Sequence, residues 1–412
     1  MQTTKPAPSL QLVEAKLPVG AQSRWPMHES DEIEAVTKVL LSGEVNALVH
    51  GTQNRAFEAE FAQYLGVSHA LALSNGTVAI ELALRALGIG PGDEVIVPAR
   101  SFFATASAVV AAGASPIFAD VEADTQNIDP NSVERLLCDR TRAIICVHLA
   151  GQPCDMDRLC TIATANGLRL IEDCAQAHGA TWRGSPVGSF GDAGCFSFCT
   201  DKIMSTGGEG GMVVMDDERS WRIAAAYKDH GKNPLRMRER ANTPPGEFRF
   251  LHDDFGSNFR MTEMQAAIGR RQLAKLDGWV ARRRANAEAL IAAACSSPAV
   301  LPLRLPEEAR HAYYKAYVRL DLDRFPAGIS RSDVIAALMD RGIVCGSGSC
   351  PDMSREAAFQ NVEAKRDGEL ANAHLIARET LMFQVDHTLD PEQTATVGRC
   401  VAEVVNRLAD LS

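Results

Sequence analysis

The chain has 412 residues, of which 46% are hydrophobic and 23% charged, a composition typical of a soluble globular protein with two or three domains. Its formal net charge of −10 argues against broad nucleic-acid binding, which needs a basic surface, but leaves room for a local site that binds an anionic metabolite. No signal peptide and no apolar run of roughly 18 residues is found, so we expect a cytoplasmic protein without a membrane partner. The 11 cysteines are scattered without CxxC spacing, which predicts reduced thiols and no zinc or other metal site.

The first third of the sequence predicts helices followed by an alternation of strands and helices. In order, the expected elements are an N-terminal arm (1–25), two helices (31–41 and 54–66), a strand (70–73), a turn (74–76), a helix (77–87) and a strand (94–97). This is the rhythm of an α/β domain, and it continues to "FSFCTDKIMSTGGEGGMVV" (196–214), which has a strand–loop–strand pattern.

The remaining sequence predicts a long polar loop, a long helix and a second domain. The loop (228–261) is rich in arginine, and the helical region after it (262–294) is expected to be interrupted at Gly278 or before it. The last hundred or so residues alternate strand and helix again. We therefore predict an N-terminal arm (1–25), a large domain with a mostly parallel sheet flanked by helices (26–275) and a smaller C-terminal α/β domain (276–412).

Two stretches at the predicted strand ends are candidates for binding a phosphorylated ring. In "LSNGTVAIELAL", a turn of small residues opens directly into a helix, whose free N–H groups favour a phosphate; a plain helix cap is the alternative. In "LIEDCAQAHG", an apolar strand ends at Asp173, where ligands bind in α/β sheets. A carboxylate there can hold a protonated ring nitrogen, and a helix cap or an ordinary salt bridge is the alternative.

Two further side chains complete the pattern. Phe102 follows a strand and can stack on a flat ring, although a core phenylalanine gives the same sequence. Lys202 precedes a glycine-rich loop between two apolar segments, and it is either a loop lysine or a buried amine with a chemical role. Together, a phosphate turn, an aromatic, a strand-end aspartate and a lysine are what pyridoxal phosphate requires.

With these residues in view, the chain resembles the DegT/DnrJ family of pyridoxal-phosphate sugar aminotransferases, of fold type I. The matching stretches run almost end to end and include "ALALSNGTVAIELALRALGIGPGDEVIVP", "VHLAGQPCDMD", "IEDCAQAHGA", "FSFCTDKIMSTGGEGGM", "GSNFRMTEMQAAIG" and "HAYYKAYV". The resemblance implies an enzyme that moves an amino group from an amino acid, expected to be L-glutamate, to a keto group of a nucleotide-linked deoxysugar. Pyridoxamine phosphate forms in the half-reaction.

The resemblance also implies roles for individual residues. It assigns the Schiff base and proton transfer to Lys202, the ring nitrogen to Asp173, the phenolic oxygen to Gln176, ring stacking to Phe102, and the phosphate to Gly76, Thr77 and Ser197. Asn258 would reach the phosphate of a neighbouring subunit, which implies a homodimer with active sites at its interface.

The substrate side is less defined by the sequence. The cations of the polar loop are candidates to clamp a diphosphate, or they are solvated surface groups: Lys228, Lys232, Arg236, Arg238, Arg240 and Arg249. Other candidates to face the substrate are His148, His311, Tyr313, Tyr314 and Lys315, and His148 fits a core position equally well.

Several alternatives share the cofactor but differ in chemistry. The acceptor can be a cyclitol or an aminoglycoside-precursor ketone, and relatives with histidine in place of the lysine are sugar dehydratases, whereas position 202 is lysine here. A regulatory protein without turnover is a further alternative. "CTDK" and "CGSGSCPDMSREAAF" depart from the commoner family pattern near the expected substrate mouth.

Overall fold

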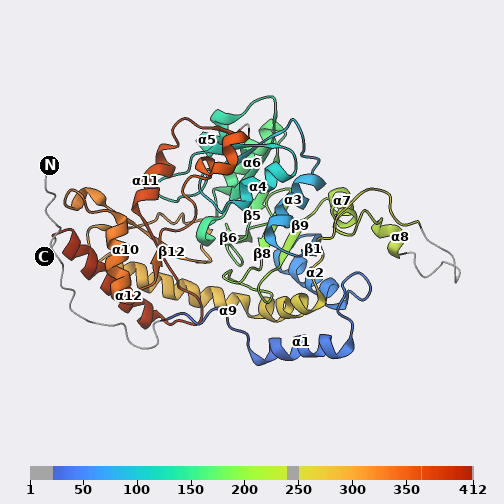
Figure 1. Ribbon diagram of the computed structural model, residues 1–412, viewed down its shortest axis with the longest axis horizontal. Coiled ribbons are helices and arrows are strands. Elements are labelled where there is room, and N and C mark those ends of the chain that lie inside the picture. Colours follow the sequence, from blue (N-terminus) through green and yellow to red (C-terminus); the bar gives the residue numbers. More distant parts are fainter. Residues whose placement is uncertain (1–21, 239–249, 363, 411–412) are drawn as a thin grey trace, which may run out of the picture.

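The computed structural model describes residues 22–238, 250–362 and 364–410 (Figure 1). Most of the predicted N-terminal arm, together with Arg240 and Arg249 of the basic loop, lies outside these ranges. In the described ranges no helix combines the length and the apolar character that crossing a membrane requires.

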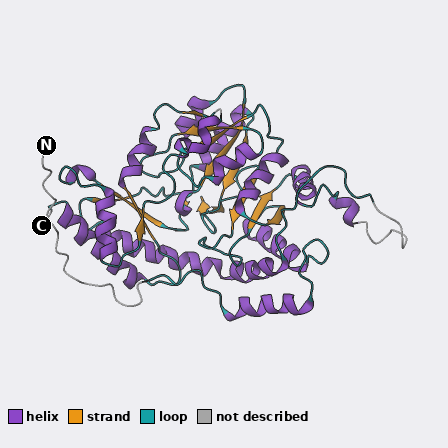
Figure 2. Ribbon diagram, viewed as in Figure 1, coloured by secondary structure: helices purple, strands orange, loops and turns teal. Residues whose placement is uncertain are grey.

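The large domain is built on an eight-stranded sheet in the order β1-β9-β8-β5-β4-β2-β3-β14. Its strands are β1 (His69–Leu73), β2 (Glu94–Pro98), β3 (Ser115–Ala119), β4 (Thr141–Val147), β5 (Arg169–Asp173), β8 (Ala193–Ser197), β9 (Gly211–Met215) and β14 (Lys365–Arg366). Only the pairs of β9 with β1 and β8 are antiparallel, so the prediction of a mostly parallel sheet is confirmed. Its central strands are almost continuously apolar because helices cover both faces (Figure 2).

The helices of the large domain follow the predicted alternation. They are α1 (Ser30–Ser42), α2 (Thr52–Leu65), α3 (Gly76–Ala86), α4 (Ala104–Ala111), α5 (Pro130–Leu136), α6 (Met156–Asn166), α7 (Glu218–Lys228) and α8 (Pro234–Arg238). Gly66 ends α2 in the left-handed conformation, as the sequence predicts. The start of α2 depends on a distant residue, because the carboxylate of Glu263 accepts hydrogen bonds from the backbone N–H groups of Gln53 and Asn54.

The long helix α9 (Glu263–Ala294) is continuous, so the predicted interruption at Gly278 is wrong. Leu276 and Val280, on either side of this glycine, are buried in the core, and their packing outweighs the weak helix propensity of one glycine, about 1 kcal/mol. α9 packs against α1 and α2 and then against α12 (Figure 1). The predicted domain boundary at residues 275 and 276 falls inside this helix and stays a prediction.

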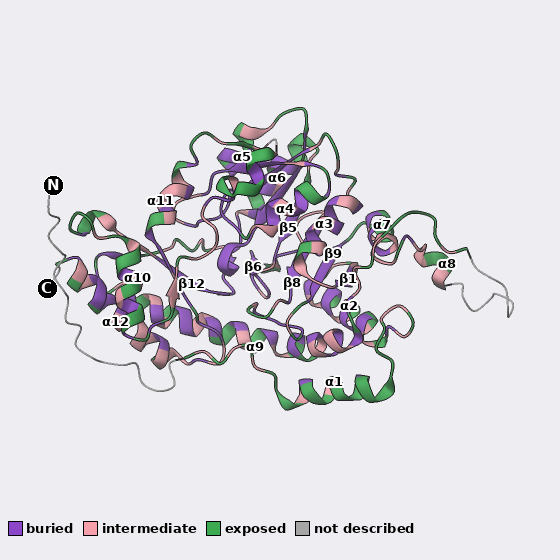
Figure 3. Cartoon of the chain, in the orientation of Figure 1, coloured by how far each residue is buried: buried purple, intermediate pink, exposed green. Residues whose placement is uncertain are grey.

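The C-terminal part contains its own sheet and core. A four-stranded sheet has the order β10-β12-β15-β13, and a small three-stranded sheet has the order β11-β6-β7. The remaining elements are β6 (Thr181–Trp182), β7 (Ser185–Pro186), β10 (Val300–Pro302), β11 (Ala309–Arg310), β12 (Ala316–Leu320), α10 (Arg331–Asp340), β13 (Cys345–Gly346), α11 (Ala371–Glu379), β15 (Thr380–Phe383) and α12 (Pro391–Leu408). Figure 3 shows buried segments in the eight-stranded and the four-stranded sheet, whereas α1 is largely exposed.

Candidate active site

Four neighbouring parallel strands bring the predicted site residues to one edge of the large sheet. Asp173 is the last residue of β5, His148 directly follows β4, Phe102 lies four residues after β2, and Lys202 lies five residues after β8. Because β8, β5, β4 and β2 are adjacent and parallel, their carboxyl ends share this edge. The edge is where ligands bind in open α/β sheets.

Asp173 is a buried carboxylate held by two neutral donors. It is 4% exposed, and it accepts hydrogen bonds from the Thr105 hydroxyl at 2.8 Å and from the backbone N–H of Ala175 at 3.1 Å. Burial raises the pKa of Asp173, while these donors and the charge of Lys202 oppose the rise. Among the described residues no cation forms an ion pair with this carboxylate, so it is suited to hold a cationic ring nitrogen.

Lys202 presents its amine to a small polar cluster. Its side chain is 14% exposed, and Nζ lies 3.9 Å from Oδ1 of Asp201 and 4.7 Å from the centroid of the Tyr314 ring. The hydroxyl of Tyr314 donates a hydrogen bond to Asp201, and the indole of Trp25 donates one to the carbonyl of Lys202 at 2.8 Å. These contacts position both the backbone and the amine of Lys202.

The turn predicted to bind a phosphate leads directly into the start of α3. The side chain of Asn75 caps the helix by accepting the N–H of Val78, which leaves the N–H groups of Gly76 and Thr77 without carbonyl partners inside the helix. A Cβ on Gly76 would lie 2.6 Å from Cβ of Ser197, so only glycine allows this close approach to the end of β8. The side chain that caps α3 is therefore that of Asn75.

Phe102 and Gln176 border the same edge. Phe102 is 65% exposed, which leaves its ring face open to a ligand and excludes the alternative of a core phenylalanine. Gln176 is buried, and its Oε1 accepts the backbone N–H of Ala150 at 2.7 Å, which leaves its amide N–H₂ as a donor.

His148 belongs to a buried hydrogen-bond network rather than to an open surface. Its Nδ1 accepts the N–H of Cys154 at 3.1 Å, so Nε2 donates to Glu172, also at 3.1 Å. Glu172 also accepts the backbone N–H groups of Gly188, Phe190 and Gly191. His148, Glu172 and Cys174 lie close enough to suit a metal, but these hydrogen bonds already occupy the carboxylate and the imidazole.

The other predicted substrate residues are dispersed. His311 is buried and stacked on Tyr313, with burial lowering its pKa to about 3, which is the environment of a neutral packing residue. Tyr314 is brought against Lys202, and Nζ of Lys315 lies 4.8 Å from the same ring. Lys232 is half-buried and Asn258 is exposed, and both belong to the polar loop.

Sequence reasoning missed three residues that contact the site. Asp201 stands in the "CTDK" stretch, and only that departure from the family pattern signalled it. Thr105, which holds Asp173, and Trp25, which holds the Lys202 carbonyl, had no signal, because their partners lie 68 and 177 residues away in the chain.

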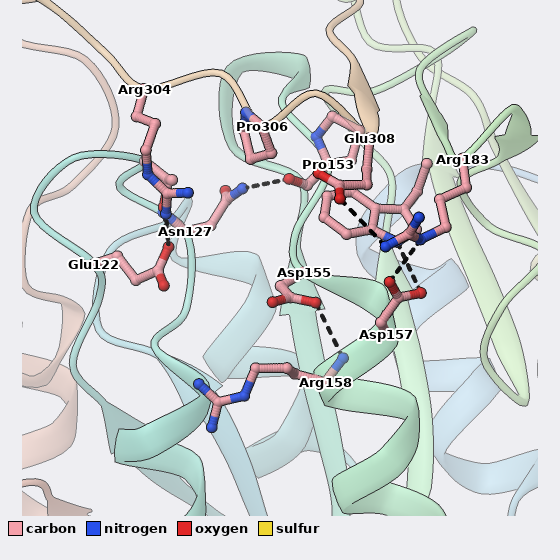
Figure 4. Close-up of a pocket in the computed structure, with 12 residues that line it drawn as sticks. Glu122, Asn127, Pro153, Asp155, Asp157, Arg158, Arg183, Arg304, Pro306 and Glu308 are labelled. Carbon is pink, nitrogen blue, oxygen red and sulfur yellow. Dashed lines mark hydrogen bonds and ion pairs between the residues drawn. The ribbon is translucent and has the colours of Figure 1, made fainter.

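A polar pocket of about 280 Å³ lies elsewhere and shares none of these residues (Figure 4). Its charges pair with one another: Arg183 with Asp157 and Glu308, and Arg304 with Glu122. The third arginine of its lining, Arg158, pairs with Glu134, so all three arginines of this pocket are neutralised by carboxylates.

The residues fit pyridoxal phosphate. The edge combines an amine, a buried carboxylate without a cation, an exposed aromatic ring and open N–H groups beside a serine hydroxyl. These match the aldehyde, the ring nitrogen, the ring face and the phosphate of that cofactor.

Comparison with known proteins agrees with this chemistry. The profile of the DegT/DnrJ/EryC1/StrS aminotransferase family matches residues 26–402. The crystal structure of an aminotransferase from Psychrobacter cryohalolentis is 44% identical, with a TM-score of 0.90 over 94% of this chain and 99% of that one. A dTDP-3-amino-3,4,6-trideoxy-alpha-D-glucose transaminase of Streptomyces venezuelae is 34% identical over 91% of this chain and 92% of its own length.

A more distant structure shows another chemistry in the same fold. The GDP-4-keto-6-deoxy-D-mannose-3-dehydratase of E. coli with bound hydrated PLP is 26% identical, with a TM-score of 0.81 over 95% of this chain and 100% of that one. The large parallel sheet, the site at its edge and the match over nearly the whole chain agree. The chain belongs to the DegT/DnrJ/EryC1/StrS aminotransferase family of pyridoxal-phosphate-dependent fold type I enzymes, the sugar transaminases.

Proposed function

We propose that the enzyme transfers an amino group from L-glutamate to a keto group of a nucleotide-linked deoxysugar. The observation that carries this proposal is the presence of the Lys202 amine and the buried Asp173 carboxylate at one sheet edge. When bound, pyridoxal phosphate supplies an electron-accepting ring and the carbon that carries the amino group between substrates.

The residues of the chain have distinct tasks in this proposal. Nζ of Lys202 would take the proton from the donor carbon that bears the amino group and deliver it to the cofactor carbon that receives this group, while Asp201 and Tyr314 fix the position of the amine. Asp173 keeps a proton on the ring nitrogen, and Thr105 orients its carboxylate. Gly76, Thr77 and Ser197 hold the phosphate, Phe102 covers the ring, and Gln176 donates to the phenolic oxygen.

A homodimer completes the proposed site. Asn258 is exposed, and nearby Phe255 is 93% exposed, so this segment can offer a polar and an apolar side chain to a second copy of the chain. We assign Asn258 to the phosphate of the neighbouring subunit's cofactor. Sedimentation of the purified protein with and without Phe255→Ser tests this, and a dimer that the substitution weakens supports the proposal.

The acceptor class depends on the polar loop. Lys228 pairs with Asp229, and Arg236 pairs with Asp253, so two of the six cations are neutralised within the described part of the loop. This pairing favours the second candidate, a cyclitol or aminoglycoside-precursor ketone that carries no diphosphate. A nucleotide sugar then depends on Lys232 and on the loop residues outside the described ranges.

A comparison of acceptors distinguishes the two candidates. With L-glutamate as donor, we would compare nucleotide-linked keto-deoxysugars with cyclitol ketones by mass spectrometry of the aminated product. For a nucleotide sugar, Lys232→Gln raises KM about tenfold, the loss of one charge-assisted contact, whereas Lys38→Gln on α1 leaves it unchanged. Amination of cyclitol ketones alone overturns the nucleotide-sugar assignment. Product release without any amine donor indicates elimination instead.

A further inference from the structure

Arg100 follows β2 at the same sheet edge as Asp173. The next residue, Ser101, has its hydroxyl 2.9 Å from that of Thr105, which in turn donates to Asp173. Phe102, with its exposed ring, comes one residue later. Arg100 therefore stands one residue from the hydrogen-bond chain that reaches the cofactor carboxylate.

The guanidinium of Arg100 is buried without a partner. The residue is 1% exposed, and within the described ranges none of its three guanidinium nitrogens makes a hydrogen bond. Burial lowers the pKa of Arg100, which reflects the cost of a desolvated charge. A buried charge in a protein is normally paired, so this one is prepared for a ligand or is unfavourable to the fold.

Among the described residues no carboxylate forms an ion pair with Arg100. The centroid of the Tyr317 ring lies 5.7 Å from Cζ, and the like charge of Arg331 adds to the effect of burial in lowering the pKa of Arg100. Other largely buried arginines have acceptors: Arg319, two residues from Tyr317 on β12, binds Glu379, and Arg341 binds Glu403. The lack of an acceptor distinguishes Arg100 from these residues.

A thin segment of small residues covers Arg100. A Cβ on Gly348 would lie 2.8 Å from Nη2 of Arg100, and the bridge between Ser101 and Cys350 holds the same segment in place. Residues 345–350 are half-buried or exposed, so the segment that contacts the guanidinium at Gly348 itself faces solvent. The segment belongs to "CGSGSCPDM", which departs from the commoner family pattern.

We propose that Arg100 is a binding residue for a substrate carboxylate, reached when residues 345–350 move aside. A planar guanidinium with five N–H donors matches a carboxylate in a bidentate pair. The assignment rests on the proposed aminotransfer, because an amino-acid donor brings such a group to this edge. An acidic sugar acceptor is the other source of the same chemistry.

The test measures melting temperature in the protein loaded with pyridoxal phosphate. Arg100→Met is expected to melt at or above the wild-type temperature, because it removes an unpaired buried charge. The matched control, Arg319→Met, breaks an ion pair and is expected to melt lower. If Arg100→Met is destabilised as much as Arg319→Met, the guanidinium is structural and the proposal is overturned.

The ligand is identified with simple probes. Glutarate represents the donor and D-glucuronate an acidic acceptor, with 1,5-pentanediol, D-glucose and inorganic phosphate as controls. At least one carboxylate is expected to raise the wild-type melting temperature. The shift in melting temperature is expected to be at least tenfold smaller in Arg100→Met and Arg100→Lys. Glutarate alone assigns the donor, and glucuronate alone assigns the acceptor. The proposal is overturned if neither carboxylate, or only phosphate, raises the melting temperature. This test needs no turnover, so it can fail or succeed independently of the proposed amino transfer.

Discussion

The hydroxyl of Thr105 donates a hydrogen bond of 2.8 Å to Oδ2 of Asp173, which ties α4 to the carboxyl end of β5. This contact orients the carboxylate that we assign to the ring nitrogen. Its second partner, the N–H of Ala175, comes from the backbone and cannot be removed by substitution of a side chain. Substitution of Thr105 is therefore the direct way to change the orientation of the Asp173 carboxylate.

Thr105→Val is expected to slow the half-reaction with glutamate by about ten- to hundredfold, since a hydrogen bond to a charged group contributes roughly 1.5–3 kcal/mol. Rapid-mixing absorbance of the bound cofactor measures the rate. Thr105→Ser retains the hydroxyl and is expected to remain within a few-fold of wild type. Equal rates for the valine variant and wild type would remove Thr105 from the site.

Burial of the Asp173 carboxylate makes the stability of the cofactor-free fold depend on pH. Its folded pKa is raised by burial, so its contribution to stability is complete below the unfolded pKa of about 3.9 and is lost as pH rises through the folded pKa. Without cofactor, Asp173→Asn is therefore expected to melt higher than wild type at pH 7 to 8, with the difference shrinking toward acid pH.

With saturating pyridoxal phosphate the order reverses, because the amide cannot hold the positive ring nitrogen. Circular dichroism melts over a pH series check both halves of this prediction. A cofactor-free asparagine variant that melts below wild type at pH 8 would show that the buried carboxylate is not a destabilising charge.

Tyr314 lies against Lys202, the lysine that we propose to be catalytic. Tyr314→Phe keeps the ring beside Nζ but removes the hydrogen bond to Asp201, so we expect about a tenfold slower half-reaction with cofactor affinity unchanged. Stopped-flow rates and cofactor titration measure the two quantities. Tyr64→Phe, which breaks a hydrogen bond to Asp277 outside the site, is the control and should match wild type.

Substitution of Gly76 tests whether the turn before α3 binds the phosphate of the cofactor. In Gly76→Ala the new Cβ lies 2.6 Å from Cβ of Ser197, so α3 must shift, and we expect pyridoxal phosphate to bind about ten- to hundredfold more weakly. Equilibrium dialysis measures the affinity. In Gly278→Ala, on the exposed face of α9, the Cβ meets no atom within 4 Å; it should leave affinity unchanged and stabilise the fold by up to about 1 kcal/mol.

The large sheet can be predicted well from the sequence because its buried strands are short apolar runs that stand out between polar turn residues. Strands such as β2 and β4 are nearly continuous apolar runs between turn residues, and the cofactor residues follow them directly. From the sequence alone, Asp173 could therefore be placed at the end of a strand, Gly76 in a turn after a strand, and Lys202 in a loop after a strand.

What the sequence could not predict depends on contacts between distant residues. The continuity of α9 at Gly278 results from core packing on both sides of the glycine, and the start of α2 is capped by Glu263, more than 200 residues away. The hydrogen bond between Tyr314 and Asp201 joins residues that lie 113 positions apart in the chain. No local pattern signals that Arg100 is buried without an acceptor.

The most direct test of the central claim is the half-reaction of wild type and Lys202→Ala. Both proteins are loaded with pyridoxal phosphate, and L-glutamate is added without an acceptor. We expect the visible absorbance of the cofactor to convert to that of pyridoxamine phosphate in wild type only, with 2-oxoglutarate released in equal amount. Equal conversion in the alanine variant, or none in wild type with any amino-acid donor, would contradict it.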